Sequence, residues 1–328
     1  MSTLLKVEHL SVNRNKRKKV LNIIDDISFE VNEGEIFALV GESGSGKSIT
    51  VQAITGMLSP GLNVSSQKIK LSTWDLKRNK RRDWEKIRGK HIGMVFQDPM
   101  TSLNPTLTIG KQLIEIFTIK EKISSKDAKE RAIQLLKDVD INLPEARLKQ
   151  YPHELSGGMR QRVLIAMAIA LNPELIIADE PTTALDVTTQ KQILHLLKEH
   201  KVKRNGSVLI ITHDLGVVAE IADKVGIMYA GKLVEVGKVQ DIFDHPKHPY
   251  TKGLLASLIK KDTEKKEKLS IIEGTPPTPE EKDKGCPFVN RCEHAMNICR
   301  MQFPPEYYLN SQKVACWLHA PERGDQLG

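Results

Sequence analysis

The chain has 328 residues, which is enough for one large α/β domain and a smaller region at roughly 100 to 200 residues per domain. Its longest unbroken apolar run, residues 163–171, is half of the roughly 18 residues that a bilayer span needs. A membrane-spanning chain is therefore excluded. The first residues lack the cationic start and apolar core of a secretory signal, so we expect a cytoplasmic protein.

The formal net charge of +8 is compatible with an anionic partner. The basic residues gather at 14–19 (RNKRKK) and 77–82 (KRNKRR), and no stacking aromatics are interleaved with them. This pattern favours a solvated face, with contact to an anionic membrane surface as the second interpretation. We expect no nucleic acid partner.

Residues 4–40 are expected to form an antiparallel β layer that leads into the apolar strand 36–40 and then the loop GESGSGKS. The spacing G-x4-GKS, followed by a helical pattern over 49–58, predicts a P-loop that binds a nucleoside triphosphate. Lys47 adds charge for the outer phosphates and Ser48 a hydroxyl for Mg²⁺. The expected phosphate contacts are Gly41, Ser43, Gly44, Ser45, Gly46, Lys47 and Ser48.

The middle of the chain alternates strands with helices. An apolar strand over 92–96 ends at Gln97, and residues 100–151 have a helical pattern with a capping signal at Ser124. Ser156, Gly157 and Gly158 then open an apolar helix, and its bare N–H groups suit a second anion contact. We interpret 100–151 as a helical insertion.

The next buried strand, 175–178, carries Asp179 and Glu180 at its carboxyl end, where ligands of doubly wound sheets bind. Asp179 is expected to hold Mg²⁺ and Glu180 to face the attacking water. A helix over 189–200 leads to the core strand 208–212, which ends at His213. Residues 225–236 are predicted to form a closing hairpin.

These motifs in this order resemble the ATPase subunits of ABC transporters, over about residues 4–257. The resemblance implies two cassettes that hold two ATP molecules head to tail, with Ser156, Gly157 and Gly158 touching the nucleotide of the partner. It also implies catalytic roles for Lys47 and three strand-end residues. Glu180 would polarise the water, Gln97 would sense the γ-phosphate, help hold Mg²⁺ and couple to the membrane partner, and His213 would position the γ-phosphate.

The turn Ala184, Leu185, Asp186 also matches, and Asp186 would link the two nucleotide sites. Two positions depart from the family pattern. Met159 stands where the signature usually has glutamine, a variant common in the peptide-importer branch. The adenine-stacking aromatic expected near residue 14 is replaced by Asn13 and Arg14, so Arg14 would have to stack through its planar guanidinium.

The resemblance implies an α/β fold: a P-loop NTPase core with an antiparallel β layer and a helical subdomain, plus a small cysteine-containing C-terminal extension. We place the ABC ATPase domain at 1–257, with the helical subdomain at about 98–165, and the extension at 258–328. The motifs at 245–251 (HPKHPYT), 274–277 (GTPP) and 285–292 resemble the oligopeptide/dipeptide/nickel importer ATPases.

All four cysteines lie in this extension, at Cys286, Cys292, Cys299 and Cys316. Their spacing lacks the C-x2-C pairs of common zinc modules, so from the residues alone a zinc site, an iron–sulfur cluster and four unliganded thiols all stay open. Resemblance to the branch favours a [4Fe-4S] cluster, with Zn²⁺ as the alternative.

The predicted function is an ATP-hydrolysing subunit for uptake of oligopeptides or dipeptides, at the cytoplasmic face of the membrane as a peripheral protein. Its expected cofactors are ATP and Mg²⁺. Its expected partners are two transmembrane permeases, a second ABC ATPase that is a paralogue and, indirectly, an extracytoplasmic binding protein. Uptake of nickel or a metal chelate is the alternative cargo, and a soluble ABC ATPase acting on ribosomes or DNA is the alternative class.

Overall fold

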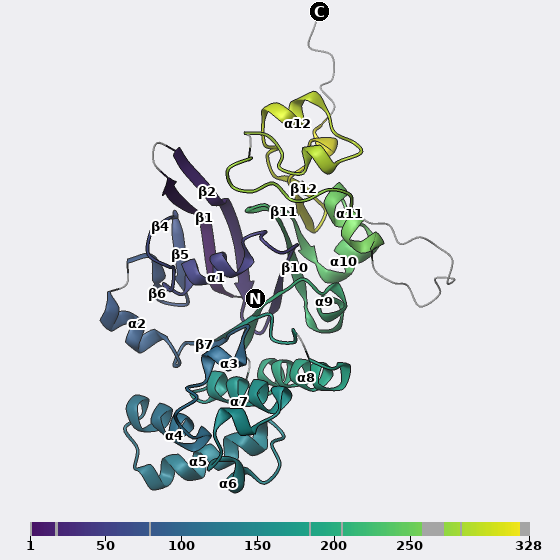
Figure 1. The fold of residues 1–328 in the computed structure, drawn as a ribbon. Coiled ribbons are helices and arrows are strands. Elements are labelled where there is room, and N and C mark those ends of the chain that lie inside the picture. Colours follow the sequence, from purple (N-terminus) through teal and green to yellow (C-terminus); the bar gives the residue numbers. More distant parts are fainter. Residues whose placement is uncertain are drawn as a thin grey trace, which may run out of the picture. The chain divides into compact units, whose positions relative to one another are not determined.

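The computed structural model describes residues 2–16, 19–78, 80–183, 185–204, 206–257, 272–282 and 284–321 (Figure 1). The chain divides into two compact units. The first contains residues 1–5, 30–36 and 71–212, and the second contains residues 6–29, 37–70 and 213–328.

The antiparallel layer expected near the N-terminus is present, mostly in the second unit. Its strands are β1 (Thr3–Lys16), β2 (Lys19–Asn32), β4 (Leu62–Ser65) and β5 (Lys68–Leu71). The side chains of β1 alternate, so that Leu10 and Val12 are buried while Ser11 between them is half-exposed. This alternation is what a strand with one solvated face requires.

The second unit also contains a run of hydrogen-bonded strands in the order β12-β13-β11-β10-β3. Strand β3 (Ile36–Val40) is parallel to β10 (Lys224–Tyr229), and β10 forms the expected antiparallel hairpin with β11 (Lys232–Lys238). The short strands β12 (Tyr307–Leu309) and β13 (Gln312–Val314) complete the run. The helices of this unit are α1 (Lys47–Ile54), α9 (Leu215–Ile221), α10 (Val239–Asp244), α11 (Pro249–Ala256) and α12 (Asn297–Met301).

In the first unit three parallel strands lie in the order β9-β8-β7, namely β9 (Ser207–Thr212), β8 (Leu175–Asp179) and β7 (Ile92–Val95). Strand β9 is buried along its whole length, as expected of a parallel strand covered on both faces. A two-residue strand, β6 (Trp74–Asp75), precedes these elements. The α-helices of this unit are α2 (Arg81–Ile87), α3 (Pro99–Ser102), α4 (Ile109–Lys120), α5 (Ser125–Asp138), α6 (Pro144–Arg147), α7 (Gly157–Ile169) and α8 (Val187–Arg204).

The helical insertion predicted over 100–151 is confirmed by α3 to α6, which gather with α7 in Figure 1. Ser124 accepts a hydrogen bond from the N–H of Asp127 and caps α5, as its position in the sequence predicts. The helix predicted over 49–58 ends earlier, at Ile54, because Gly56 has a left-handed backbone with φ of 65°. The helix predicted over 189–200 is longer, Val187–Arg204.

The C-terminal region packs against the ATPase region through a strand and an aromatic side chain. Strand β13 pairs with β11 of the closing hairpin, where Glu235 lies opposite Val314, so this region extends the sheet. Phe288 is 3% exposed and packs against Tyr229 and Tyr250 of the ATPase region. In the part of the chain that the structure describes, no helix is both long and apolar enough to span a bilayer.

Candidate nucleotide site

The loop between β3 and α1 has the backbone that a phosphate cradle requires. Gly44 and Gly46 have left-handed φ values of 77° and 105°, which side-chain-bearing residues rarely adopt. A Cβ on Gly41 would lie 2.1 Å from the carbonyl oxygen of Met228. All three glycines of the loop are therefore required by its structure: Gly44 and Gly46 for their backbone conformation, and Gly41 for close packing.

Lys47 lies inside this loop. Its ammonium donates to the carbonyl oxygens of Gly41 at 2.7 Å and Glu42 at 3.0 Å, and Ser45 Oγ is 3.4 Å away. The side chain is 5% exposed. A positive charge is thus fixed at the glycine loop, next to the backbone N–H groups that open α1, and this combination suits a chain of phosphates.

The other predicted residues of the second unit are less enclosed. Ser43 is exposed and Ser48 half-buried, whereas Ser45 is buried and its carbonyl oxygen accepts the N–H of Gly231 at 2.8 Å. Arg14 lies on an exposed part of β1, opposite Leu62 of β4.

His213 directly follows β9 and is exposed. The next residue, Asp214, caps α9 by accepting the N–H groups of Gly216 at 2.7 Å and Val217 at 3.3 Å. A helix therefore begins immediately after the predicted catalytic histidine, which fixes the backbone at that point.

In the first unit the predicted catalytic carboxylate is held by two donors. Glu180 Oε2 accepts the amide N–H of Gln97 at 3.2 Å and the hydroxyl of Thr183 at 2.9 Å. The N–H of Glu180 donates to the carbonyl of Ile211 on β9 at 2.9 Å, and its φ is 46°. A side-chain-bearing residue in the left-handed region is a strained position, and such strain gathers at functional sites.

Asp179 ends strand β8 beside Glu180 and is half-buried. Asp186 lies just before α8, where its carboxylate accepts the N–H of Thr189 at 2.9 Å and the Thr189 hydroxyl at 2.7 Å. These hydrogen bonds, the backbone one first, lower the pKa of Asp186. Ala184, part of the same predicted turn, lies outside the described residues.

The predicted second anion contact is the start of α7. Ser156 caps this helix by accepting the N–H of Met159 at 3.3 Å. A Cβ on Gly158 would meet Thr189 at 2.8 Å, whereas a Cβ on Gly157 would meet nothing within 4 Å. Packing within this chain therefore does not explain the glycine at 157.

The four cysteines of the C-terminal region line one small cavity of about 20 Å³, together with His248, Phe288 and Trp317. Burial raises the pKa of Cys286 to about 12 and that of Cys316 to about 11, and it also raises the pKa of Cys292. Within the described residues, no group of three or more His, Cys, Asp or Glu side chains is arranged to hold a metal ion. The structure therefore brings the thiols to one place without a closed ligand shell.

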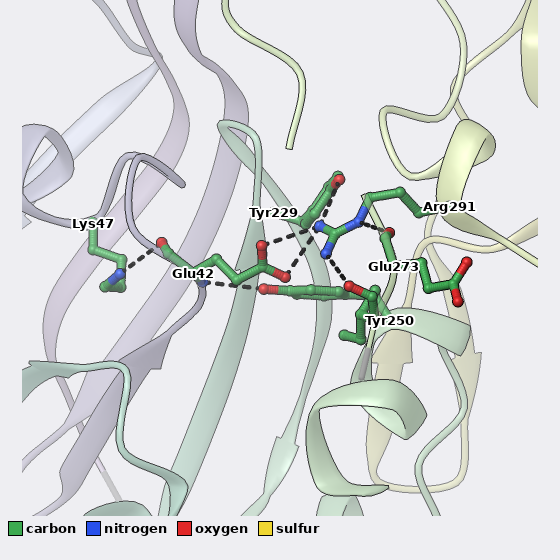
Figure 2. A network of polar contacts seen from close by, with 7 residues as sticks. Glu42, Lys47, Tyr229, Tyr250, Glu273 and Arg291 are labelled. Carbon is green, nitrogen blue, oxygen red and sulfur yellow. Dashed lines mark hydrogen bonds and ion pairs between the residues drawn. The ribbon is translucent and has the colours of Figure 1, made fainter. Parts of the chain in front are cut away.

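One part of the site went unpredicted. Glu42, inside the P-loop, forms an ion pair with Arg291 of the C-terminal region, and Tyr229 and Tyr250 bond to the same pair (Figure 2). In the sequence, Arg291 belongs only to the tail motif at 285–292. No periodicity or spacing connects two residues 249 positions apart.

The glycine loop with its lysine, and the carboxylate pair at the end of a parallel strand, define a P-loop nucleoside triphosphatase. The family description "ABC transporter" matches residues 24–183, and "Oligopeptide/dipeptide transporter, C-terminal region" matches residues 234–299. The chain belongs to the ABC transporter ATPases, in the oligopeptide/dipeptide branch.

Two curated relatives match almost end to end. The chain is 47% identical over 328 residues to the oligopeptide transport ATP-binding protein AppD of Bacillus subtilis (strain 168), covering 99% of this chain and 100% of AppD. It is 45% identical over 324 residues to the dipeptide transport ATP-binding protein DppD of Haemophilus influenzae, covering 99% of this chain and 98% of DppD. The predicted family is confirmed.

Among solved structures, the chain resembles the ATP-binding cassette MJ0796 in a dimeric post-hydrolysis state bound to ADP and Pi. The TM-score is 0.65 at 28% identity, over 72% of this chain and 98% of MJ0796. The cassette cbiO1 from Clostridium perfringens, part of the complex cbiONQ, gives a TM-score of 0.63 at 28% identity over 75% of this chain and 92% of cbiO1. The expected P-loop NTPase fold of the ABC ATPase core and the ATPase activity are thereby confirmed.

Proposed function

We propose that the chain hydrolyses ATP to drive the import of oligopeptides or dipeptides, as a peripheral subunit at the cytoplasmic face of the membrane. The similarity over nearly full length to peptide transport ATP-binding proteins supports this function. The structural observation that best supports this function is an apolar groove lined in part by Phe96. Phe96 directly precedes Gln97, whose amide is bonded to the candidate catalytic carboxylate of Glu180.

The catalytic step is assigned to the first unit's polar residues. Glu180 orients and deprotonates the attacking water, and Gln97 and Thr183 hold its carboxylate in one rotamer. Bound ATP supplies the phosphoryl group that is transferred to water. Because phosphoryl transfer depends on positioning and charge, the main contribution of Lys47 is a fixed positive charge for the outer phosphates.

We also assign residues to Mg²⁺ and to the base and γ-phosphate of ATP. Ser48, Gln97 and Asp179 offer a hydroxyl, an amide and a carboxylate oxygen, and oxygen ligands of this kind suit Mg²⁺. His213 is proposed to position the γ-phosphate, and Arg14 to stack on the adenine.

The proposed assembly is a dimer of two different ABC ATPases. Ser156, Gly157 and Gly158 would contact the nucleotide held by the P-loop of a second ABC ATPase, a paralogue, with Asp186 linking the two sites. The uncrowded backbone at Gly157 supports this role. An extracytoplasmic binding protein would deliver the peptide to two permeases, and it would not touch this chain.

The groove is the proposed docking site for a permease. It measures about 470 Å³ and is lined mainly by apolar side chains of β7, α4 and α7. Phe96 and Ile119, which line it, are 44% and 61% exposed, so the apolar surface of the groove is open to solvent. An amphipathic helix in a cytoplasmic loop of the permease would cover this surface and push on Gln97 through Phe96.

A pull-down tests the whole function. The tagged chain would be extracted from native membranes in mild detergent, and the proteins that co-purify in stoichiometric amounts identified. Two polytopic permeases, a second ATPase and peptide-stimulated ATP hydrolysis are expected. Ribosomal proteins or DNA would contradict the transport function, and stimulation by nickel chelates alone would contradict the cargo.

For the cysteine cavity we propose a metal centre, an iron–sulfur cluster with Zn²⁺ as the alternative. Four thiols around one cavity fit either centre in kind and number. Burial raises the pKa of Cys286 and of Cys316, and a bound cation would favour the thiolate forms that serve as metal ligands.

The test is metal analysis of protein purified without oxygen. Iron with acid-labile sulfide and a visible absorption band would support the cluster, and one equivalent of zinc in colourless protein would support the alternative. Neither metal, with four titratable thiols, would overturn the centre. The Cys299→Ser variant serves as the control, since it should lose whichever metal is present.

A further inference from the structure

Arg291 connects the C-terminal region to the P-loop. Its Nη1 donates to both carboxylate oxygens of Glu42, at 3.1 and 3.0 Å, and to the hydroxyl of Tyr229 at 3.2 Å (Figure 2). Its Nη2 donates to the carbonyl of Ile272 at 3.1 Å, and Nε to the carbonyl of Glu273 at 2.9 Å. Every nitrogen of the guanidinium is used, and the side chain is only 7% exposed.

Such a fully bonded planar cation has one orientation, so the position of its partner is fixed as well. The partner, Glu42, is the residue after the first P-loop glycine. Its N–H donates to the hydroxyl of Tyr250 at 3.1 Å, and its carbonyl accepts from Lys47 at 3.0 Å. The same residue is therefore bonded to the P-loop lysine and to the C-terminal region.

The surroundings of the pair are rigid. Tyr229, Tyr250 and Phe288 form a cluster with ring centroids 4.6 to 5.4 Å apart, and Phe288 comes from the same segment as Arg291. These aromatic contacts hold the C-terminal segment against β10 and α11 without the ion pair. Removal of the ion pair should therefore leave the segment in place.

The ion pair affects the charge of the P-loop as well as the packing around it. Glu42 puts a carboxylate into a loop whose other features attract anions, and an unpaired carboxylate there would repel a triphosphate. Arg291 neutralises this charge and holds it by both oxygens.

We propose that Arg291 is a positioning residue for ATP binding: by holding and neutralising Glu42, it makes the affinity of the P-loop depend on the C-terminal region. The inference rests on ATP binding at the P-loop, which is part of the proposed function. Because binding energies are linked, ATP must in turn stabilise the Arg291 contacts.

The test compares ATP affinity, measured with a fluorescent ATP analogue, across four purified variants. Arg291→Gln should weaken binding about tenfold, within the usual range of coupling between sites. Arg291→Lys keeps the positive charge but loses the planar guanidinium with its several donors. Its ATP affinity should lie between that of the wild type and that of Arg291→Gln. The double variant Glu42→Gln/Arg291→Gln should bind within about threefold of wild type, since no carboxylate is left unpaired.

The fourth variant, Arg300→Gln, is the matched control, because Arg300 is an exposed arginine of the same region whose guanidinium donates to Asn290 at 3.1 Å. It should bind ATP like wild type. Hydrogen exchange adds the reciprocal measurement. ATP should slow exchange over residues 286–292 in the wild type and should do so less in Arg291→Gln.

Two results would overturn the inference. One is an Arg291→Gln protein that binds ATP as tightly as wild type. The other is a weakened Arg291→Gln that the added Glu42→Gln does not rescue, which would mean that Arg291 acts only through the stability of the region. Wild-type protein that fails to bind the nucleotide would instead refute the proposed function itself.

Discussion

The amide of Gln97 donates to the carboxylate of Glu180 at 3.2 Å, so the end of β7 and the end of β8 are joined at the candidate catalytic carboxylate. Thr183 provides a second donor at 2.9 Å. The side chain is thus oriented before any substrate binds, although its backbone has a φ of 46°. Orientation of this kind reduces the reorganisation that the reaction requires.

Glu180→Gln should lower ATP hydrolysis by roughly 10²- to 10³-fold, since a general base commonly contributes 10² to 10⁴. ATP binding should persist, and the variant mixed with the second ABC ATPase should accumulate as an ATP-bound dimer on size exclusion. The control is Glu174→Gln, at the other end of β8, where the carboxylate bonds His91 at 2.6 Å. Unchanged turnover in Glu180→Gln would refute the catalytic role.

A second prediction concerns the start of α7. Gly157→Ala adds a methyl group into open space, and alanine favours a helix, so the melting temperature should not fall. If the bare backbone contacts the partner's nucleotide, ATPase activity should nevertheless drop by at least about tenfold.

Gly158→Ala separates the two effects. Its new Cβ would lie 2.8 Å from Thr189, which is bonded to Asp186, so this variant should lose both stability and activity. A Gly157→Ala protein with full activity would show that this glycine has no contact with nucleotide.

The third prediction is a dependence of stability on pH. Lys282 donates to the carbonyls of Asn22 at 3.0 Å and Ile23 at 3.2 Å, and burial lowers its pKa to about 8, with Asp25 opposing and Lys232 adding to the shift. The unfolded chain therefore binds more protons than the folded chain between pH 8 and 10.5. Within that window this residue makes stability rise with pH.

The measurement is chemical denaturation of wild type and Lys282→Gln from pH 7 to 10. The wild type should gain up to about 1.4 kcal/mol per pH unit over the variant above pH 8. A difference that does not change with pH would show that the ammonium is as well solvated in the fold as in the unfolded chain.

The parts of the site that sequence predicted are local. The P-loop, the Ser156 cap and the Asp179–Glu180 pair each occupy a few consecutive residues, and the chemistry of each depends on their spacing. The helix predicted to reach 58 ended at Ile54, because a single left-handed glycine stops it and the apolar pattern does not show where.

The parts that sequence could not predict depend on long-range contacts. Strands β12 and β13 have three residues each, which is too few to show an alternating pattern in the sequence. They form because β13 pairs with β11, a contact between segments far apart in the chain. The ion pair of Glu42 and Arg291 joins residues 249 positions apart, which lie together only in the folded chain. Each residue lies in a motif, Glu42 in the P-loop and Arg291 in the tail motif, but neither motif indicates that the two residues pair.

The last prediction tests the groove of β7, α4 and α7. Phe96→Asp or Ile119→Asp puts a charge on its apolar rim, so either variant should fail to co-purify with the permeases, because burying a carboxylate against an apolar helix is costly. Both side chains are already exposed, and stability should change by less than about 0.5 kcal/mol. The control is Val202→Asp on α8, which is 80% exposed and outside the groove.

Permease capture by both groove variants would mean that this surface is not where the membrane partner binds. Loss of capture together with retained ATP binding would instead place the contact one residue from Gln97. Peptide-stimulated hydrolysis should then disappear, while basal hydrolysis by the purified pair of ATPases persists.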